Sequence, residues 1–329
     1  MATTSPQFAH GSRLAVVMDP IEAIHPAKDT TLALLLEAQR RGYSPYYVRP
    51  GSMWAAGGAA WARVQPLQVR DSESDWFSLG EIETVALENF DVILMRKDPP
   101  FDQEYVYLTY LLELAESAGA RVVNRPRALR DYNEKASILK FPDLTPPTLI
   151  ACDIESFREF HRLEEHIVIK PLDGMGGRGV FVLGPGDTNL SSVVEMLTEN
   201  GIRHAMAQRY LPAIRQGDKR VLVVAGKAVP YMLARLPATG ESRGNLAAGG
   251  RGEPRPLGKA EKRIAETVGP HLAAAGLDFV GLDIIGESLT EINVTSPTCV
   301  RELDRAYGLN IAGDLFKAIE SRNPENTSE

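Results

Sequence analysis

Short apolar runs alternate with helix-like segments through the first 125 residues of the chain. Leu14–Met18 has the pattern of a buried strand, and the spacing of leucines predicts a helix over Thr30–Arg41, with Asp29 as its N-cap and Gly42 at its end. Further predicted elements are strands at Tyr46–Arg49, Val64–Val69, Asp91–Met95 and Arg121–Val123, and a helix over Asp102–Ser117. Strands that alternate with helices predict an open, largely parallel sheet, whose ligands bind at the carboxyl ends of the strands.

Charged residues follow two of these predicted strands. Asp19-Pro20 comes after the first strand, and Arg96-Lys97 comes after Asp91–Met95. One interpretation is that Arg96 and Lys97 are solvated loop charges. The other is that Arg96 clamps a substrate carboxylate, because a guanidinium can bind a carboxylate through two parallel N–H bonds.

A glycine-rich loop lies between two apolar strands in the middle of the chain. Ile167–Lys170 leads into it, Val180–Leu183 returns from it, and it contains Gly174, Gly176, Gly177 and Gly179. Because a strand follows instead of a helix, the glycines lack the context of a dinucleotide fingerprint, and the loop also lacks the Gly-Lys-Ser/Thr ending of a P-loop. The sequence therefore predicts a flexible hairpin whose N–H groups close over phosphates.

Two lysines are candidates for the same phosphates. Lys170 alternates with Val168 on an apolar strand, where a buried ammonium group needs an anionic partner. A helix predicted over Arg127–Phe141 places Lys135 either in solvent or at the nucleotide. Two more helices are predicted, at Ile154–Leu163 and Leu190–Glu199.

After residue 203, paired strands are followed by a long loop. Strands are predicted at His204–Tyr210, Val221–Ala225 and Ala228–Leu233. Arg220 and Arg235 flank the last two, as rim charges or as part of a site for an anionic substrate. Residues 236–258 show no periodicity, and such loops inside compact domains are usually functional or disordered. Their glycines, with Arg243 and Arg251, indicate a lid that excludes water from a charged intermediate.

The stretch 279–295 contains the clearest candidate metal site. Two apolar runs flank Gly286-Glu287-Ser288 and predict a β-hairpin, preceded by a helix over Lys259–Ala275. With a three-residue loop, Ile285 pairs with Leu289, and Asp283 then lies opposite Glu291 on the face that also carries Asn293.

Two opposed carboxylates about 5 Å apart repel each other by roughly 3 kcal/mol at an effective dielectric constant of about 20. A divalent cation removes this repulsion, and the oxygen atoms of Asp283, Glu291 and Asn293 suit Mg²⁺. The alternatives are a solvated acidic hairpin, a protonated carboxylate, or a carboxylate paired with an arginine.

The composition narrows the possible classes of function. The chain has 329 residues, 44% hydrophobic and 24% charged, which is enough for two or three domains. Its net charge of −7 argues against general binding of nucleic acid or anionic membranes, so an anionic substrate requires local arginines and lysines. Two distant cysteines, Cys152 and Cys299, fit a reducing cytoplasm. No apolar run approaches the roughly 18 residues of a membrane span, and residues 1–12 form a polar tail that lacks the apolar centre of a signal peptide.

Several motifs together resemble the bacterial glutathione synthetases of the ATP-grasp superfamily. They are Met95-Arg-Lys-Asp-Pro-Pro-Phe, Lys170-Pro-Leu-Asp-Gly-Met-Gly-Gly, Asp218-Lys-Arg-Val-Leu-Val, Arg243-Gly-Asn-Leu-Ala-Ala-Gly-Gly-Arg-Gly-Glu-Pro-Arg-Pro, Leu282-Asp-Ile-Ile-Gly and Thr290-Glu-Ile-Asn-Val-Thr-Ser-Pro-Thr-Cys. The resemblance runs from Leu14 to Ile319. It implies an α/β protein with a parallel-sheet substrate domain at 13–125, followed by an ATP-grasp fold with a lid domain at 126–203 and a C-terminal domain at 204–320.

The resemblance also implies roles for residues. ATP is expected at Lys135, Lys170, Gly174, Gly176, Gly177, Gly179, Gln208, Tyr210, Leu211 and Asp218, with adenine at the main chain of Tyr210 and Leu211 and the ribose at Asp218. Mg²⁺, or Mn²⁺ in its place, is expected at Asp283, Glu291 and Asn293. The peptide site is expected to contain Arg96, Arg220, Arg235, Asn293 and Ser296, and the catalytic arginines are Arg220, Arg235, Arg243 and Arg251.

The implied reaction joins γ-glutamylcysteine to glycine at the expense of ATP, through an acylphosphate. It takes place in the cytoplasm, in a homo-oligomer that the resemblance suggests is a tetramer, without nucleic acid or membrane as partner. Two alternatives stay open: a related ligase with another acceptor or dipeptide, and a non-catalytic ATP-binding regulatory protein. The chain departs from the family in its N-terminal tail and in Arg178, where a smaller residue is expected.

Overall fold

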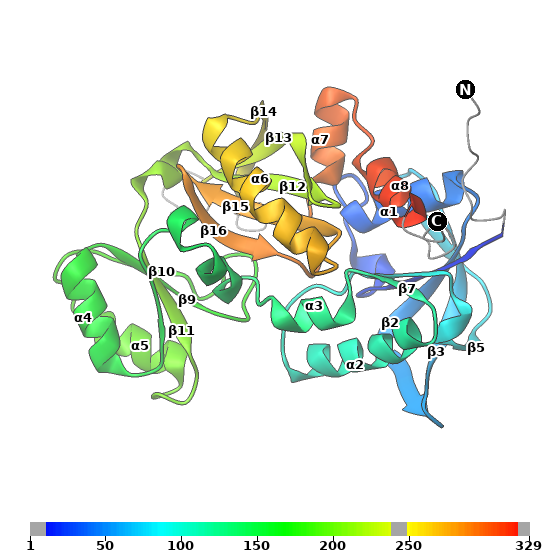
Figure 1. Cartoon of the computed structure of the whole chain (residues 1–329), viewed down its shortest axis with the longest axis horizontal. Helices are drawn as coiled ribbons and strands as arrows, with labels where there is room; N and C mark the ends of the chain where they lie inside the picture. The colour runs from blue at the N-terminus through cyan, green and yellow to red at the C-terminus, as the bar shows by residue number, and fades with distance from the viewer. Residues whose placement is uncertain (1–10, 238–248, 322–329) are drawn as a thin grey trace.

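The computed structural model of the chain describes residues 11–237 and 249–321. Within these residues it contains a seven-stranded, a four-stranded and a five-stranded sheet, which follow one another along the chain (Figure 1). Helices lie against all three, so the expected α/β class is confirmed. The predicted tail at 1–12 lies almost entirely outside the described residues, as do residues 322–329.

The seven-stranded sheet is parallel only at its centre. Its strands are β1 (Arg13–Val17), β2 (Ser44–Ala56), β3 (Ala59–Val69), β4 (Phe77–Leu79), β5 (Glu83–Ala86), β6 (Val92–Met95) and β7 (Arg121–Val123). The order is β4-β3-β2-β1-β6-β7, with β5 also paired to β3. Strands β2, β1, β6 and β7 are parallel to one another, whereas β3 pairs antiparallel with β2, β4 and β5. The prediction of a largely parallel sheet is therefore correct for the centre and wrong for the β3 side.

Two helices of this region begin where the sequence predicts. Helix α1 spans Thr30–Arg40, and the Asp29 carboxylate accepts a hydrogen bond from Leu32 N at 2.6 Å. Helix α2 spans Gln103–Ser117, and Asp102 caps it in the same way through Tyr105 N. These caps satisfy N–H groups that have no partner within the helix.

The predicted helix over Arg127–Phe141 is wrong. Helix α3 covers only Pro126–Asp131, and the chain then turns before two short 3₁₀ segments at Ala136–Lys140 and Pro142–Leu144. The Asn133 side chain is the reason, because its Oδ1 accepts hydrogen bonds from Lys135 N at 3.0 Å and Ala136 N at 2.9 Å and so competes with helical bonding. Lys135 consequently lies in a turn and is buried.

The four-stranded sheet is antiparallel throughout and has its own apolar core. It consists of β8 (Thr148–Ala151), β9 (Ile167–Pro171), β10 (Phe181–Leu183) and β11 (Ala205–Arg209), in the order β10-β9-β11-β8. Helices α4 (Ile154–Glu164) and α5 (Leu190–Thr198) cover it and bury Phe157 and Val194 against Ile167 and Ile169. The glycine loop connects β9 to the antiparallel strand β10, which confirms the predicted hairpin.

The five-stranded sheet is also antiparallel. It consists of β12 (Asp218–Val224), β13 (Lys227–Leu236), β14 (Arg251–Pro256), β15 (Phe279–Ile285) and β16 (Ser288–Asn293), accompanied by α6 (Lys259–Ala274), α7 (Val300–Tyr307) and α8 (Ile311–Ser321). The prediction that 236–258 is a loop throughout is wrong, because Arg251–Pro256 pairs with β13 along its length. Arg243 lies outside the described residues.

The β15–β16 hairpin reaches the predicted arrangement by a different route. Its loop is Gly286-Glu287, so Ile285 pairs with Ser288 and Ile284 with Leu289, instead of Ile285 with Leu289. A β-bulge at Thr290 then restores the predicted pairing of Asp283 with Glu291. Since a bulge places two residues opposite one, it compensates for the shorter loop.

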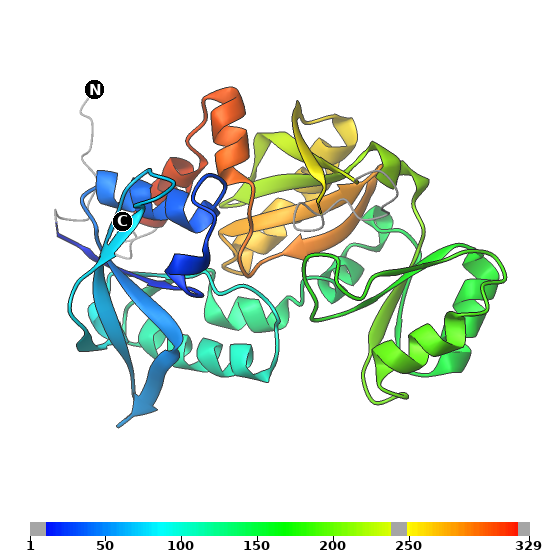
Figure 2. The same cartoon turned by 180° about the vertical axis from the view of Figure 1, so that it is seen from behind.

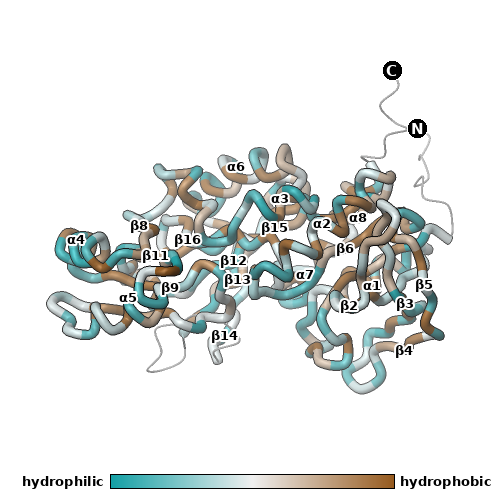
Figure 3. The backbone as a smooth tube through the Cα atoms, turned by 90° about the horizontal axis from the view of Figure 1, so that it is seen from below, coloured by the Kyte–Doolittle hydropathy of each residue, from teal (hydrophilic) through white to brown (hydrophobic). Residues whose placement is uncertain are grey.

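The three buried apolar clusters do not correspond one to one with the three sheets. Two buried clusters contain side chains from both the seven-stranded and the five-stranded sheet, whereas the cluster around Phe157 contains only residues of 151–207. Seen from behind, the four-stranded sheet with α4 and α5 forms a separate lobe beside the rest (Figure 2). The hydropathy of the backbone shows a largely hydrophilic α7 (Figure 3).

Candidate active site

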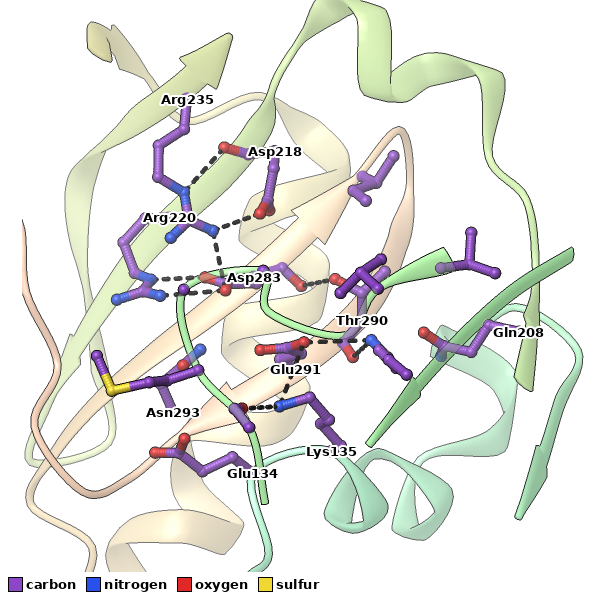
Figure 4. A pocket seen from close by; sticks show the side chains of 18 of the residues that line it. Glu134, Lys135, Gln208, Asp218, Arg220, Arg235, Asp283, Thr290, Glu291 and Asn293 are labelled. Atoms are coloured by element: carbon purple, nitrogen blue, oxygen red, sulfur yellow. Dashed lines mark hydrogen bonds and ion pairs between the residues drawn. The ribbon is translucent and has the colours of Figure 1, made fainter. Parts of the chain in front are cut away.

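A cavity of about 300 Å³ lies between the four-stranded and five-stranded sheets. It is lined on one side by the glycine loop, β9 and β11, and on the other by β12, β13 and the β15–β16 hairpin (Figure 4). Most predicted site residues line it, namely Lys135, Lys170, Gly174, Gly176, Gly177, Gln208, Tyr210, Leu211, Asp218, Arg220, Arg235, Asp283, Glu291, Asn293 and Ser296. The structure therefore brings together residues that lie up to 161 positions apart in sequence.

Asp283 is held between two buried arginines. Arg220 donates from Nε to Oδ1 at 2.5 Å and from Nη2 to Oδ2 at 3.1 Å, and Arg235 Nη2 lies 2.9 Å from Oδ2. Gly281 leaves room for Arg220, because a Cβ added there would lie 2.8 Å from Arg220 Cδ. Burial alone would raise the pKa of Asp283, but the two guanidinium groups hold it well below its usual range. The sequence alternative of an arginine-paired carboxylate is thus realised for this residue.

Asp218 extends this network and keeps one free oxygen. Arg235 Nη2 donates to its Oδ2 at 2.5 Å, while Oδ1 is buried and accepts no hydrogen bond from any described residue. Burial, partly offset by Arg235, raises the pKa of Asp218 to about 6. A buried acceptor without a donor is costly, so Oδ1 fits a ligand hydroxyl group.

Glu291 faces two lysines across the cavity. Its Oε1 lies 3.2 Å from Lys170 Nζ and 3.9 Å from Lys135 Nζ. Burial would raise the pKa of Glu291, but the two ammonium groups lower it below its ordinary value. Burial also lowers the pKa of Lys170, against the opposing effect of Glu291. Lys170 thus has the anionic partner that its place on an apolar strand requires, and the bulged Thr290 supplies a second acceptor through its carbonyl at 3.5 Å.

The glycine loop is tied to the same lysine pair. Lys135 Nζ donates to Gly174 O at 2.6 Å, which fixes the start of the loop. Gly176, Gly177 and Gly179 have φ between 65° and 76°, a left-handed conformation that side chains with a Cβ rarely adopt. Gly179 does not line the cavity, and Arg178 is exposed at its rim.

One end of the cavity offers main-chain groups. Tyr210 N already donates to His166 O at 2.8 Å, whereas Leu211 N has no acceptor within the described part of the chain. The Tyr210–Leu211 peptide is trans, so the Tyr210 carbonyl and the Leu211 N–H point in opposite directions. Only one of them can therefore face a given edge of a ligand. Gln208 is buried beside them and donates to Thr148 Oγ1 at 3.1 Å.

The structure does not bring Arg96 or Arg251 into the cavity lining. Arg96 is buried behind it, where Nε donates to Thr31 Oγ1 at 3.1 Å and Nη2 to Pro297 O at 2.9 Å. Arg251 is exposed at the start of β14 and pairs with Glu253. Arg96 thus contacts the chain next to Ser296, whereas Arg251 lies on an edge strand.

The donor set of the hairpin fits a hard divalent cation. Within residues 11–237 and 249–321, no group of three acidic, histidine or cysteine side chains is close enough to hold a metal. Asp283 and Glu291 lie opposite each other, and Asn293 adds an amide oxygen two residues further along the same strand face, while its Nδ2 donates to Gly281 O. Carboxylate and amide oxygens without sulfur or imidazole suit Mg²⁺ or Mn²⁺.

Sequence reasoning missed several residues of the cavity wall. Glu134 is buried, lines the cavity, and accepts hydrogen bonds from Val294 N, Thr295 N and Thr295 Oγ1 at 2.8–3.0 Å. Burial raises its pKa in spite of these bonds. Thr298 and Cys299 also line the cavity. The proximity of Glu134 to Lys135 was the available signal, but the wrongly predicted helix hid which residues share a face.

Comparison with known proteins identifies the family. The model for the N-terminal domain of prokaryotic glutathione synthetases matches residues 13–130, and the model for their ATP-grasp domain matches 134–308. The glutathione synthetase of Pseudomonas syringae is 55% identical over 310 residues, covering 94% of this chain and 97% of that protein. Those of Yersinia pestis and Escherichia coli K12 are 55% and 53% identical, with 94% of this chain and 98% of each relative covered.

Solved structures with low sequence identity share the fold. A D-cycloserine synthetase superposes with a TM-score of 0.66 at 17% identity, covering 94% of this chain and 99% of that one. An ATP-grasp protein from Sphaerobacter thermophilus gives 0.60 at 18% identity, with 93% and 98% covered. In the described residues, no helix has the length and apolar character needed to cross a membrane. The expected family is confirmed: the chain belongs to the prokaryotic glutathione synthetases, which are ATP-grasp ligases.

Proposed function

We propose that this enzyme uses ATP and Mg²⁺ to join γ-glutamylcysteine to glycine, giving glutathione, ADP and phosphate. The γ-phosphoryl group passes to the cysteinyl carboxylate, the amine of glycine attacks the resulting acylphosphate, and phosphate leaves. One observation carries the proposal. Glu291, with Lys135 and Lys170 at its side, faces the cavity directly opposite Asp283 in a chain that is 55% identical to a glutathione synthetase.

The charges of the cavity interior support a metal-bound nucleotide. Apart from the exposed Asp98, Arg178 and Arg209, the cations are Lys135, Lys170, Arg220 and Arg235, and the acids are Glu134, Asp218, Asp283 and Glu291. Because these charges balance, the interior has no excess of positive charge for the triphosphate. Asp283, Glu291 and Asn293 would hold the divalent cation, which neutralises phosphate charge when it is bound. Mn²⁺ is chemically acceptable at the same oxygens.

The chain's own residues bind and orient the substrates in this proposal. Lys135 and Lys170 contact the phosphates, and the N–H groups of Gly174, Gly176, Gly177 and Gly179 cover them. Leu211 N donates to adenine beside Gln208 and Tyr210, and Asp218 Oδ1 accepts from the ribose. Arg220, Arg235, Asn293 and Ser296 contact the peptide, since they share the wall next to the hairpin.

Arg96 has a supporting part in this scheme. Its contact with Pro297 O places it behind Ser296, so it acts on the dipeptide through the main chain. Arg243 and Arg251 act on the acylphosphate in this proposal, with Arg251 placed at the start of β14. We further propose a lid domain at 126–203 between the domains at 13–125 and 204–320, a cytoplasmic location and a homo-oligomer, in keeping with the family.

The test is ADP release by the purified protein with ATP and Mg²⁺. Turnover should need both γ-glutamylcysteine and glycine, and should fall on the order of a hundredfold in Glu291→Gln, which removes a charge that faces the phosphates. Glu287→Gln is the matched control, because Glu287 is an exposed acid in the turn of the same hairpin. Turnover with alanine or β-alanine but not glycine would indicate a different acceptor. ATP binding without stimulated turnover would indicate a regulatory protein.

A further inference from the structure

Three consecutive residues, Asn133, Glu134 and Lys135, connect the glycine loop to the β15–β16 hairpin. Asn133 Nδ2 donates to Leu172 O at 3.2 Å, and Lys135 Nζ donates to Gly174 O at 2.6 Å. Glu134 points the other way, toward the chain that follows β16 (Figure 4). The side chains therefore alternate between the two walls of the cavity.

Glu134 makes four hydrogen bonds with the end of β16. Its Oε1 accepts from Val294 N at 2.9 Å, Thr295 N at 3.0 Å and Thr295 Oγ1 at 2.8 Å. Its main-chain carbonyl accepts from Ile292 N at 2.8 Å. The main-chain N–H groups that follow the last paired residue of a strand have no acceptor in the sheet. Here the buried Glu134 side chain provides that acceptor.

The segment that Glu134 holds is the one that presents side chains to the cavity. Asn293 and Ser296 lie on either side of Val294 and Thr295, and all but Val294 line the cavity. Val294 and Thr295 are buried, and Asn124 Nδ2 donates to Val294 O at 2.8 Å, so Glu134 and Asn124 hold this segment from two directions. A shift of the main chain at 294–295 would therefore move Asn293 and Ser296 directly.

Resting on the proposed function, we propose that Glu134 is a positioning residue that sets the place of Asn293 and Ser296 and thereby the binding of the dipeptide. It acts through Val294 N and Thr295 N. Burying a carboxylate costs free energy that a neutral residue would avoid, and three donors on one oxygen offset part of that cost. Such an arrangement suits a residue that fixes geometry.

The experiment compares Glu134→Ala with Glu134→Gln. Alanine removes the acceptor, whereas glutamine keeps an oxygen for the N–H groups of Val294 and Thr295. We expect Glu134→Ala to raise KM for γ-glutamylcysteine about tenfold, in line with the loss of hydrogen bonds to a charged group, while KM for ATP, to which Asn293 contributes through the divalent cation, rises by a clearly smaller factor. Glu134→Gln should restore most of the dipeptide KM.

Two further measurements separate positioning from general stability. Amide exchange in the absence of substrates should accelerate at Val294 and Thr295 in Glu134→Ala and not in Glu134→Gln. Glu37→Ala is the matched control, since Glu37 on α1 is also buried, accepts from Arg40 and Arg41, and does not line the cavity. It should lower the melting temperature without changing the dipeptide KM.

The proposal is overturned if Glu134→Ala leaves both the dipeptide KM and the exchange at 294–295 unchanged, or if it changes the KM values for ATP and dipeptide equally. Should the wild type show no turnover with γ-glutamylcysteine and glycine, the proposed function fails. The exchange measurement would then still decide whether Glu134 holds this segment.

Discussion

The four-stranded and five-stranded sheets face each other across the cavity but are anchored very differently. The five-stranded sheet shares apolar clusters with the seven-stranded sheet, through residues such as Val221, Leu282 and Phe316. The four-stranded sheet has a small cluster of its own around Phe157, and it reaches the larger shared cluster through Met206, with Ile150 packed against it. At the cavity, Lys170 of this sheet pairs with Glu291 of the hairpin.

This difference indicates which wall of the cavity moves. Relative motion is expected between parts of a chain whose interface is not large and hydrophobic. The paired acids and arginines, Asp218, Arg220, Arg235 and Asp283, lie together on the well-anchored wall. The glycine loop lies on the other wall. We therefore expect the carboxylates and guanidinium groups to stay in place while the wall that carries the glycine loop moves relative to them.

The largest effect on stability is expected from removing a buried phenylalanine from each kind of cluster, either that of the four-stranded sheet or one shared by the other two sheets. Phe157→Ala and Phe316→Ala each delete a fully buried ring, which typically costs about 3–5 kcal/mol. Amide exchange followed by mass spectrometry should show faster exchange confined to β8–β11 in Phe157→Ala. In Phe316→Ala, exchange should rise in both β1 and β12, because α8 packs in their common cluster. Equal acceleration in all three sheets by both variants would mean that the molecule unfolds as one unit.

A smaller effect is expected from the charge that the four-stranded sheet contributes. Lys170→Met keeps the aliphatic stem and removes the ammonium group, so KM for ATP should rise about tenfold or more, the usual effect of losing a hydrogen bond between charged groups. Lys227→Met, an exposed lysine at the start of β13, serves as control and should behave as wild type. Steady-state kinetics with varied ATP measures this KM in both variants and in the wild type. An unchanged KM in Lys170→Met would show that the phosphates depend on the fixed wall alone.

The smallest effect is expected from the protonation of the acids in the five-stranded sheet, which makes the stability of the fold depend on pH. Asp218 has a pKa raised to about 6 by burial, so its neutral form is favoured in the folded protein. Its stabilising contribution is fully present below its unfolded pKa and is lost as pH rises from about 4 through about 6. Asp283 and Glu291 have lowered pKa values, so their contribution is present above their ordinary pKa and is lost on acidification.

The affinity for nucleotide should rise with pH as Asp218 ionises, whereas the contribution of Asp218 to stability falls. An ionised carboxylate is the stronger acceptor for ribose, so affinity should rise about threefold between pH ~5 and ~7.5. Titration with a fluorescent ATP analogue in wild type and Asp218→Asn measures this. The Asn variant should lose the pH dependence, and an unchanged profile would show that another group titrates.

Local signals in the sequence predicted most of the elements and part of the site. Asp29 and Asp102 cap helices where expected, and the glycine loop joins two strands as expected. The side-chain bonds of Asn133 could not be foreseen from apolar spacing, because an asparagine inside a helical pattern gives no sign of which N–H groups it will accept from. Lys135 was therefore placed on a helix that does not exist.

Contacts between segments far apart in sequence were the other feature that the sequence could not predict. Arg96 has the residue type of a carboxylate clamp, but its partners Thr31 and Pro297 come from distant segments. The pairing of Asp283 with both Arg220 and Arg235 likewise depends on three strands that meet only in the folded sheet. In β14, glycine and proline residues concealed a strand, because an edge strand tolerates residues that a central strand excludes.

The bulge at Thr290 shows that the number of residues between Asp283 and Glu291 decides whether the two acids share a face of the hairpin. With a two-residue turn and regular strands, Asp283 would pair with Thr290, and the Glu291 side chain would lie on the opposite face of the sheet. One additional residue anywhere between the two acids brings Asp283 and Glu291 back into register on the same face. Here that residue sits within the strand, where its carbonyl is free to meet Lys170, and not at the tip. In this chain, a change of one residue in the length of the turn would preserve the acidic pair only if the strand lost or gained a residue with it.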